Sequence, residues 1–390
     1  MIRKICFITD RYPTPEYPMN TFLDQLVCQI ADSGVECTVV APYSRVLDAM
    51  KHNNYHPPVH YVKTTEKGNR ISVYCPTIFA LTGRKIGPLN FGKLYQRLYT
   101  NAVRRVLQEN KTETDVFYGH FITPAGIAAA EMGKLHGKPS FLAYGECFIE
   151  QDSCIFTLEE IRSRLADLCG VIAVSTKNRD ELLTNRIADA GKIGVFPNAI
   201  KGSRFYRTDR KAVREKLGFS QDDFIVAFMG HFIERKGVLR VSEALKGIDG
   251  IKSIFIGSGP QKPDCPGILF SGRLPHEQIV TYLNAADVFV LPTLAEGCCN
   301  AIVEAMACGL PIISSNLPFN DDILNDTNSI RTDSRNIEEI RNAIKKLYAN
   351  EDLRNALSAG SMKTAAGLTI EERAAKILAF LENRIMQQRK

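Results

Sequence analysis

The chain has 390 residues, of which 45% are apolar and 24% are charged, and its formal net charge is +6 at pH 7. This length exceeds one ordinary hydrophobic core, so we expect two domains, and the lack of any run of about 18 apolar residues argues against a membrane-spanning helix. The first residues, MIRKICFITD, contain no long apolar stretch and no small-residue cleavage site, and they predict a strand rather than a signal peptide. The eleven cysteines form no C-x-x-C pair, which indicates reduced thiols in a cytoplasmic protein.

Runs rich in β-branched and aromatic residues predict five strands in the first half of the chain, at residues 4–9, 35–42, 115–121, 139–145 and 170–175. A helix follows the first strand, with Asn20 as its N-cap and Gly34 just past its end. A second helix is predicted to open at Thr123 and Pro124 and to close near Gly137. Strands that alternate with helices in this way predict a parallel sheet with helices on both faces.

Residues 195–207 break this rhythm, and a second series follows, with strands predicted at 223–232, 251–260, 267–272, 287–293 and 310–315. We therefore predict an α/β protein with two Rossmann-like, doubly wound domains, at residues 1–200 and 201–370. The last helical pattern, at residues 371–390, either closes the second domain or crosses back to the first.

Basic charge is concentrated between Lys67 and Gln108, a stretch with eight Lys or Arg residues and no Asp or Glu. Apolar residues recur at helical spacing near 88–107, and four cations lie off that stripe, namely Lys93, Arg97, Arg104 and Arg105. Two interpretations remain open: a solvated basic face, or a face that meets an anionic acceptor or the anionic inner leaflet of a membrane. No nucleic-acid-binding motif accompanies these charges, so no nucleic-acid partner is expected.

The segment EGCCNAIVEAMACGLP, residues 296–311, directly follows a predicted strand of the second series. Asn300 is placed to cap the helix that follows, whose first N–H groups lack partners and favour a phosphate. Gly297 lets the chain approach a ligand closely, and Glu296 and Glu304 stand at the two ends of this turn. A sugar nucleotide suits the pattern, because its diphosphate would face the amides while its two rings offer hydroxyls to the carboxylates. Taken alone, Glu304 would equally fit as a carboxylate that complements the helix dipole.

Three other loops follow predicted strands, at residues 230–237, 257–260 and 271–275. Ligands of open α/β sheets bind beyond the carboxyl ends of the strands, where these loops lie. Two of the loops carry cations: Arg235 and Lys236 in the first, and Arg273 in the third. A diphosphate leaving group needs such cations, since negative charge builds on it in the transition state.

The second half of the chain closely resembles the nucleotide-binding domain of retaining family-4 glycosyltransferases of the GT-B fold. The resemblance is carried by FMGHFIERKG, by IFIGSGP, and by the E-x7-E spacing of Glu296 and Glu304 followed by EAMACGLP. The first half is similar more faintly, through GVECTVVAPYS and YGHFITPAGIAAAEMGKLHGKP. The resemblance implies two Rossmann-like domains with a cleft between them.

Residues that match the family's motifs take on implied roles in donor binding. Glu296 would hold hydroxyls of the donor sugar, Glu304 the ribose, and Lys236 a phosphate. The backbone of the loop after Glu296 would contact the sugar and phosphate, through Gly297, Cys298, Cys299 and Asn300. Arg273 and Leu274 lie where the family holds the base, and the two cysteines supply small side chains beside the donor.

The chain departs from the family at one phosphate position and in the first domain. His231 stands where an arginine is common, and Arg235 would compensate for it. Tyr144 stands where many members have a histidine that faces the reacting carbon. Tyr144, Glu146 and His120 are therefore candidates for contacts with donor or acceptor. Ordinary core roles for Tyr144 and His120 are the alternatives.

The loop after the first strand also differs from the family's pattern. It lacks the glycine-rich turn that in many members contacts the donor phosphate or the acceptor. Asn20 and Thr21 are left as weak candidates for that contact. Helix capping is the simpler role for Asn20.

The resemblance implies retaining transfer of a sugar from a nucleotide-diphospho-sugar to a glycan or lipid-linked oligosaccharide of a capsule, exopolysaccharide or lipopolysaccharide pathway. The chain has no D-x-D motif, so no metal cofactor is expected. Two alternatives stay open: a sugar-nucleotide epimerase of the same fold, and a non-catalytic sugar-nucleotide-binding protein. The sequence leaves the base, the sugar, the acceptor and the linkage undetermined.

Overall fold

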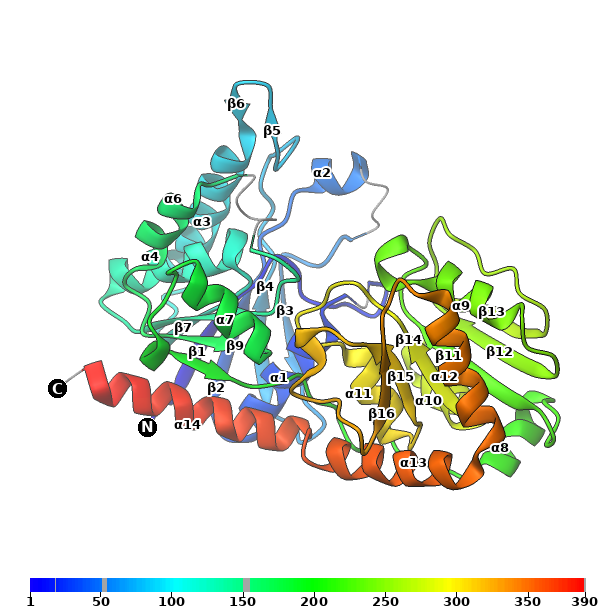
Figure 1. The fold of residues 1–390 in the computed structure, drawn as a ribbon. Coiled ribbons are helices and arrows are strands. Elements are labelled where there is room, and N and C mark those ends of the chain that lie inside the picture. The colour runs from blue at the N-terminus through cyan, green and yellow to red at the C-terminus, as the bar shows by residue number, and fades with distance from the viewer. Residues whose placement is uncertain (18, 51–54, 150–154, 389–390) are drawn as a thin grey trace. The chain divides into compact units, whose positions relative to one another are not determined.

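The structure is a computed structural model that describes residues 1–390 except 18, 51–54, 150–154 and 389–390 (Figure 1). It divides into two compact units, one made of Met1–Phe196 with Arg373–Lys390 and the other of Pro197–Glu372. The chain passes from one unit to the other close to residue 200, where the sequence pattern breaks. Within the described residues, none of the helices is both long and apolar enough to cross a bilayer.

The first unit is built on a sheet of eight strands in the order β10-β9-β8-β7-β1-β2-β4-β3. The strands are β1 (Lys4–Ile8), β2 (Glu36–Val40), β3 (His60–Thr64), β4 (Arg70–Tyr74), β7 (Val116–His120), β8 (Ser140–Tyr144), β9 (Gly170–Ala173) and β10 (Ile193–Val195). All neighbours pair in parallel except β3 and β4. The edge strand β3 has no buried residue, which explains why no apolar run predicted it.

Helices cover this sheet, and a small hairpin extends from the unit. The helices are α1 (Thr21–Asp32), α2 (Arg45–Met50), α3 (Phe91–Glu109), α4 (Ile127–His136), α6 (Leu158–Leu165), α7 (Thr176–Thr184) and α14 (Ile370–Gln388), with the short helices η1 (Ile122–Gly126) and η2 (Ala190–Lys192). The hairpin pairs β5 (Lys85–Ile86) with β6 (Leu89–Asn90). Its two-residue strands are too short to show a period of two, so the sequence did not predict them.

Two helices begin differently in the structure from what the sequence predicts. Asn20 occupies the N-cap position of α1 but has a left-handed backbone, and its side chain makes no capping bond. The second predicted helix, α4, begins at Ile127 rather than at Thr123, because Thr123 keeps an extended backbone. A residue before proline disfavours the helical conformation, which accounts for the later start. Gly137 ends α4 with a positive φ of 62°, as the sequence predicts.

The second unit is built on a six-stranded, all-parallel sheet in the order β13-β12-β11-β14-β15-β16. The strands are β11 (Phe224–Met229), β12 (Ile251–Ile256), β13 (Ile268–Gly272), β14 (Val288–Leu291), β15 (Ile312–Ser315) and β16 (Ser329–Thr332). The helices are α8 (Arg210–Leu217), α9 (Val238–Leu245), α10 (His276–Ala285), α11 (Asn300–Ala307), α12 (Ile337–Ala349) and α13 (Glu351–Ala366), with η3 (Glu234–Lys236) and η4 (Pro318–Asn320). The strand order reverses between β11 and β14, so a ligand is expected beyond the carboxyl ends of these two strands.

The C-terminal helix α14 packs on the first unit from Arg373 onward. Its Arg384 donates to the carbonyl of Cys169 at 3.0 Å, and Glu382 accepts from the backbone N–H of Ile2 at 2.9 Å. The ring of Phe380 contacts those of Phe141 and Phe196. The terminal segment therefore belongs physically to the first unit, although the chain reaches it only after completing the second.

Gly360 tests packing in the second unit, because a Cβ at this position of α13 would lie 1.8 Å from the carbonyl oxygen of Thr327. Helix propensity favours Gly360→Ala by about 1 kcal/mol, but overpacking costs about 1–3 kcal/mol. We expect the clash to prevail and Gly360→Ala to lower the free energy of unfolding measured with denaturant. Gly367→Ala is the control, since its Cβ would meet only the carbonyl of Thr364 at 3.6 Å. A stabilised Gly360→Ala variant would contradict this packing.

Candidate active site

The candidate site of the second unit lies where the loops after β11 and β14 meet. The backbone N–H of Leu294 donates to the carbonyl of Arg235 at 2.8 Å, and the Arg235 guanidinium donates to the carbonyl of Ala295 at 2.5 Å. These bonds join the 230–237 loop to the start of the EGCCN segment. Two loops about 60 residues apart in sequence therefore form one surface at the switch point of the sheet.

Glu296 is the centre of this surface, and its carboxylate is buried. The oxygen Oε1 accepts from the Thr293 hydroxyl at 2.8 Å and from Arg235 at 3.1 Å, and it also pairs with the ammonium of Lys236. No described residue is hydrogen-bonded to Oε2. A buried carboxylate is stable only when paired, and here one oxygen carries the pairing while the other stays available. Thr293 is a site residue that the sequence reasoning missed.

The charges around Glu296 fix the protonation states of its neighbours. Burial alone would lower the pKa of Lys236, but Cys299 and Glu296 outweigh it, and the pKa is raised. Burial raises the pKa of the Cys299 thiol to about 11, so this cysteine is a neutral thiol near pH 7. Desolvation, followed by the charges of Lys236, Arg273 and Arg235, lowers the pKa of His231. The site thus holds a charged lysine, a neutral thiol and a histidine biased toward the neutral form.

The turn before α11 departs from the predicted capping. Cys299, not Asn300, occupies the N-cap position, and the side chain of Asn300 lies at the first helical residue. Its amide oxygen Oδ1 is buried and has no hydrogen-bond partner among the described residues. Cys298 has a structural role, because Asn198 donates from its backbone N–H to the sulfur and from its side chain to the Cys298 carbonyl. Gly297 is buried within the same turn.

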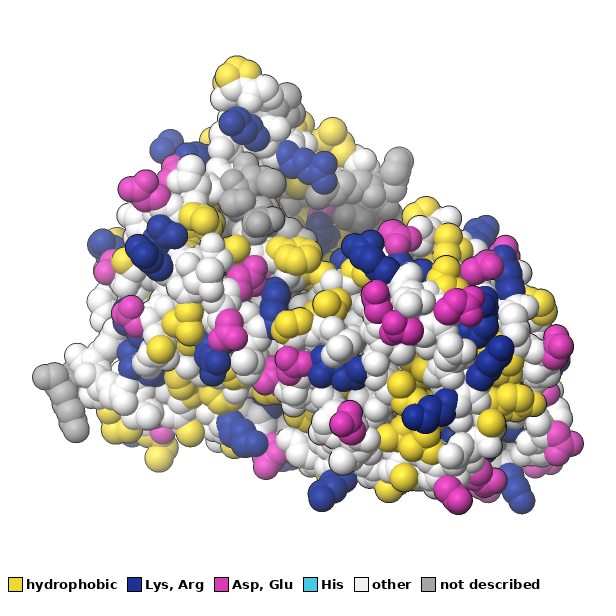
Figure 2. Space-filling model, in the orientation of Figure 1, with side chains coloured by type: hydrophobic (Ala, Val, Ile, Leu, Met, Phe, Trp, Pro, Cys, Tyr) yellow, Lys and Arg dark blue, Asp and Glu magenta, His cyan; other side chains and the backbone are white. Residues whose placement is uncertain are grey.

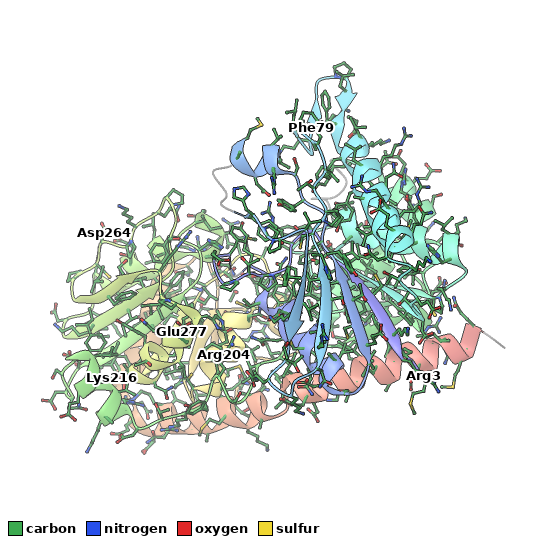
Figure 3. The ribbon with its side chains drawn as sticks, turned by 180° about the vertical axis from the view of Figure 1, so that it is seen from behind. Arg3, Phe79, Arg204, Lys216, Asp264 and Glu277 are labelled. Carbon is green, nitrogen blue, oxygen red and sulfur yellow. The ribbon has the colours of Figure 1, made fainter. Side chains whose placement is uncertain are left out.

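Glu304 lies on α11 and faces a histidine that the sequence reasoning missed. His276 Nε2 is 3.6 Å from Glu304 Oε1, and its Nδ1 is 3.2 Å from the guanidinium of Arg204. An arginine can only donate, so Nδ1 accepts and Nε2 carries the proton toward Glu304. Figure 3 shows Arg204 beside the start of α10. The three side chains come from separate segments, so no spacing pattern could have predicted the cluster.

The loops after β12 and β13 border the same edge of the sheet. Gly257 has a φ of +149°, and a Cβ there would lie 1.9 Å from the carbonyl oxygen of Gly230. This close approach brings the 257–260 loop against the loop after β11. Arg273 is exposed and donates to the Ser258 hydroxyl at 2.5 Å, and Leu274 beside it is half-buried. The predicted donor-binding residues of the second unit thus lie on four neighbouring loops.

In the first unit, His120 ends β7, and its ring is buried against Phe22 and Phe121. Neither ring nitrogen has a hydrogen-bond partner among the described residues. Phe121 follows with a φ of +70°, which is strained for a bulky side chain. An unpaired histidine beside a strained turn is an unusual combination, and such strain concentrates at functional sites. The ring is thus buried without the hydrogen bond that a satisfied core histidine would make, and a substrate contact of His120 stays a prediction.

Glu146 and Tyr144 have definite partners at the same edge. The two carboxylate oxygens of Glu146 accept from the backbone N–H groups of Ile122 and Gly145, at 2.6 and 2.9 Å. Tyr144 is fully buried in the core of the unit, and its hydroxyl donates to Glu181 at 2.7 Å. Glu146 thus holds the turn after His120, and the placement of Tyr144 favours the core role. Substrate contacts of either residue stay predictions.

The loop after β1 places Asn20 beside Asp10. The Asn20 side chain donates to Asp10 Oδ1 at 3.3 Å and to the carbonyl of Arg11 at 3.2 Å, and Thr21 is the first residue of α1. Burial raises the pKa of Asp10 despite the neighbouring charge of Arg11. The strand order puts β1 beside β7, so Asp10 lies at the switch point of this sheet. An acid directly after the first strand was the sequence signal for it.

The buried ring of His120 predicts that the stability of the first unit depends on pH. Burial, and after it the charge of Arg373, lowers the pKa of His120 from 6.5 to about 3, whereas the unfolded chain regains the ordinary value. Its contribution to stability is full above pH 6.5 and is lost as the pH falls toward 3. We expect the free energy of unfolding of the first unit to fall by about 1.4 kcal/mol per pH unit in this window from this group alone.

The His120→Gln variant lacks this titrating group. Its free energy of unfolding should therefore change less with pH than that of the original protein, and the difference in slope should correspond to about one bound proton. Denaturant unfolding of both proteins between about pH 4 and pH 5.5 measures the difference, and all other titrating groups are common to the two proteins. Equal slopes for the two proteins would show that the ring is accessible to protons in the folded state.

Comparison with known proteins relates the second unit to a family of glycosyltransferases. Residues 209–364 match the family model described as Glycosyl transferases group 1. TuaC of Bacillus subtilis, a glycosyltransferase assigned to teichuronic acid biosynthesis, is 27% identical over 325 residues, which are 80% of this chain and 81% of TuaC. CapM of Staphylococcus aureus, a capsular polysaccharide biosynthesis glycosyltransferase, is 24% identical over 223 residues, which are 52% of this chain and 59% of CapM.

The fold agrees with this assignment. The crystal structure of HepE from Anabaena in complex with UDP superposes with a TM-score of 0.73 at 15% identity, over 97% of this chain and all of HepE. The fold of the two Rossmann-like units thus matches that of this GT-B structure. The chain has the GT-B fold, and residues 209–364 of its second unit match the family model described as Glycosyl transferases group 1.

Proposed function

We propose that the protein is a retaining glycosyltransferase that moves a sugar from a nucleotide-diphospho-sugar to a glycan or lipid-linked oligosaccharide. The observation that carries this proposal is the pairing of Glu296 with Lys236 and Arg235 at the switch point of the second unit. This arrangement offers a carboxylate for hydroxyls beside two cations for a diphosphate. The relatives' names, which refer to teichuronic acid and capsular polysaccharide, support a role in bacterial surface polysaccharide synthesis.

Within this proposal, Glu296 accepts hydrogen bonds from donor-sugar hydroxyls through Oε2. Lys236 can keep its contact with Glu296 and still donate to a phosphate, because an ammonium has three donors. The unpaired oxygen of Asn300 offers a further acceptor at the same turn. Glu304, oriented by His276, takes the ribose, and Arg273 with Leu274 borders the base.

The proposed chemistry needs no side-chain base. The bond between the anomeric carbon and the leaving phosphate oxygen breaks, and the acceptor oxygen bonds on the same face. The leaving oxygen takes the acceptor's proton, while Lys236 and Arg235 stabilise the charge that builds on the diphosphate. Cations thus do the work that a metal ion does in other transferases, so the proposal is metal-independent. In the first unit, His120 and Asp10 lie at the ends of neighbouring strands, and we propose them for contact with the acceptor.

We further propose that the enzyme works in the cytoplasm, at the inner face of a membrane that carries its acceptor. The basic helix predicted near 88–107 is α3, whose Arg97, Arg104 and Arg105 are exposed. Lys93 is paired with Glu160, so the other three supply the free charge for anionic lipid.

Glu296→Gln and Lys236→Ala test the site. Both should abolish transfer, because one removes the carboxylate that binds the sugar and the other removes the phosphate cation. Transfer is measured with a panel of labelled sugar nucleotides and a membrane extract as acceptor, and circular dichroism checks that the variants fold. Lys246→Ala is the control, since this exposed lysine of the same unit only joins surface ion pairs.

The same assay separates the alternatives. Isomerisation of the nucleotide sugar without transfer would establish the epimerase, and donor binding without turnover would establish a non-catalytic protein. Near-normal transfer by Glu296→Gln and Lys236→Ala would reject the site itself.

A further inference from the structure

Four large apolar side chains are exposed within residues 79–94 of the first unit, in the hairpin and the segments on either side of it. Their exposed fractions are 72% for Phe79, 57% for Leu81, 61% for Leu89 and 51% for Leu94. We call these four residues the apolar tip. Soluble proteins rarely leave large apolar side chains clustered on the surface, and such clusters mark contacts with proteins or membranes.

The apolar tip is held in place by the fold. The segment before the hairpin is fixed at Ala80, whose carbonyl accepts from the Ser44 hydroxyl at 2.7 Å. The hairpin returns at Gly87, which has a φ of +56°, and Asn90 then caps α3 and donates to the carbonyl of Ile155 at 2.7 Å. Figure 1 shows the hairpin extending from the body of the first unit beside the start of α3. Exposure of the tip is therefore a built feature of this unit.

Exposed cations lie in the same segment of the chain as the apolar tip. Arg84 and Lys85 lie on the hairpin, and Arg97 lies one turn along α3 from Leu94; all three are exposed. We call them the basic collar. The sequence from Lys67 to Gln108 adds no carboxylate to this surface. Figure 2 shows apolar atoms at the end of the hairpin with Lys and Arg side chains behind them, and Figure 3 places Phe79 at this end of the unit.

We propose that the apolar tip inserts into the interface of an anionic membrane while the basic collar binds its lipid headgroups. An apolar end followed by cations is the arrangement of interfacial anchors, because the side chains enter the acyl boundary and the charges stay at headgroup depth. Binding of a protein partner would not require several cations beside the apolar tip. An anionic leaflet, in contrast, attracts each cation of the basic collar. The inference extends the proposed function, since it names the surface that meets the membrane of a lipid-linked acceptor, but vesicle binding itself requires no transfer.

Vesicle co-sedimentation of the purified full chain tests the proposal. The vesicles are phosphatidylcholine alone, or phosphatidylcholine and phosphatidylglycerol in equal parts. The double variant Phe79→Ser/Leu89→Ser should bind the anionic vesicles about a hundredfold more weakly, because it removes two inserting side chains. The double variant Arg84→Gln/Lys85→Gln should bind anionic vesicles with about tenfold lower affinity, and its affinity for phosphatidylcholine vesicles should be unchanged. Leu135→Ser is the matched control, since Leu135 lies on α4 of the same unit and is 55% exposed.

Insertion is read directly with tryptophan, because the chain contains none. The emission of Leu89→Trp should shift to the blue on anionic vesicles, and that of Leu135→Trp should not. An unshifted Leu89→Trp, or unchanged binding of the tip variant, would overturn the proposal. Concentration-dependent dimerisation that Phe79→Ser/Leu89→Ser abolishes would also overturn it, by assigning the tip to a second copy. Vesicle binding in a chain that transfers no sugar would leave this inference standing and reject only the proposed reaction.

Discussion

The candidate site of the second unit depends on one buried carboxylate. Glu296 has little exposure, and an unpaired charge at such a position would cost several kcal/mol. Lys236 and Arg235 remove that cost, and both come from the loop after the neighbouring strand. The pairing therefore fixes the two loops against each other as well as the charges. It also contributes to the raised pKa of Lys236, because Cys299 and then Glu296 outweigh the lowering effect of burial.

The position of this ion pair follows from the strand order of the sheet. Crossovers from β11 and β14 proceed in opposite directions, so the loops at their carboxyl ends lie where ligands of open α/β sheets bind. Gly257 brings a third loop within van der Waals contact of the first, which no residue with a Cβ would allow. An ordinary doubly wound sheet thus supplies the geometry, and a few side chains supply the chemistry.

The sequence predicted most of this site because strand ends can be recognised from apolar runs and because parallel strands end at one edge. The grouping of Lys236 with Glu296 follows from that rule alone. The contact between Glu304 and His276 does not, since nothing in either segment indicates the other. Asn300 and Tyr144 show a second limit: whether a polar side chain caps a helix, awaits a ligand or pairs inside the core depends on neighbours that come from elsewhere in the chain. The same limit applies to the fold, where most strands of the two sheets were predicted, but β3, β4, β10, β16 and the β5–β6 hairpin were not.

The two cysteines of the EGCCN turn show how a reactive residue type can serve structure. Burial keeps the Cys299 thiol protonated, which removes its nucleophile, the thiolate. Cys298 accepts a hydrogen bond from the backbone of Asn198 and so ties the start of the second unit to the turn that carries Glu296. A larger side chain at either position would displace the turn, and with it the carboxylate. Small size and a weak acceptor sulfur, rather than redox chemistry, are therefore what this site requires of its cysteines.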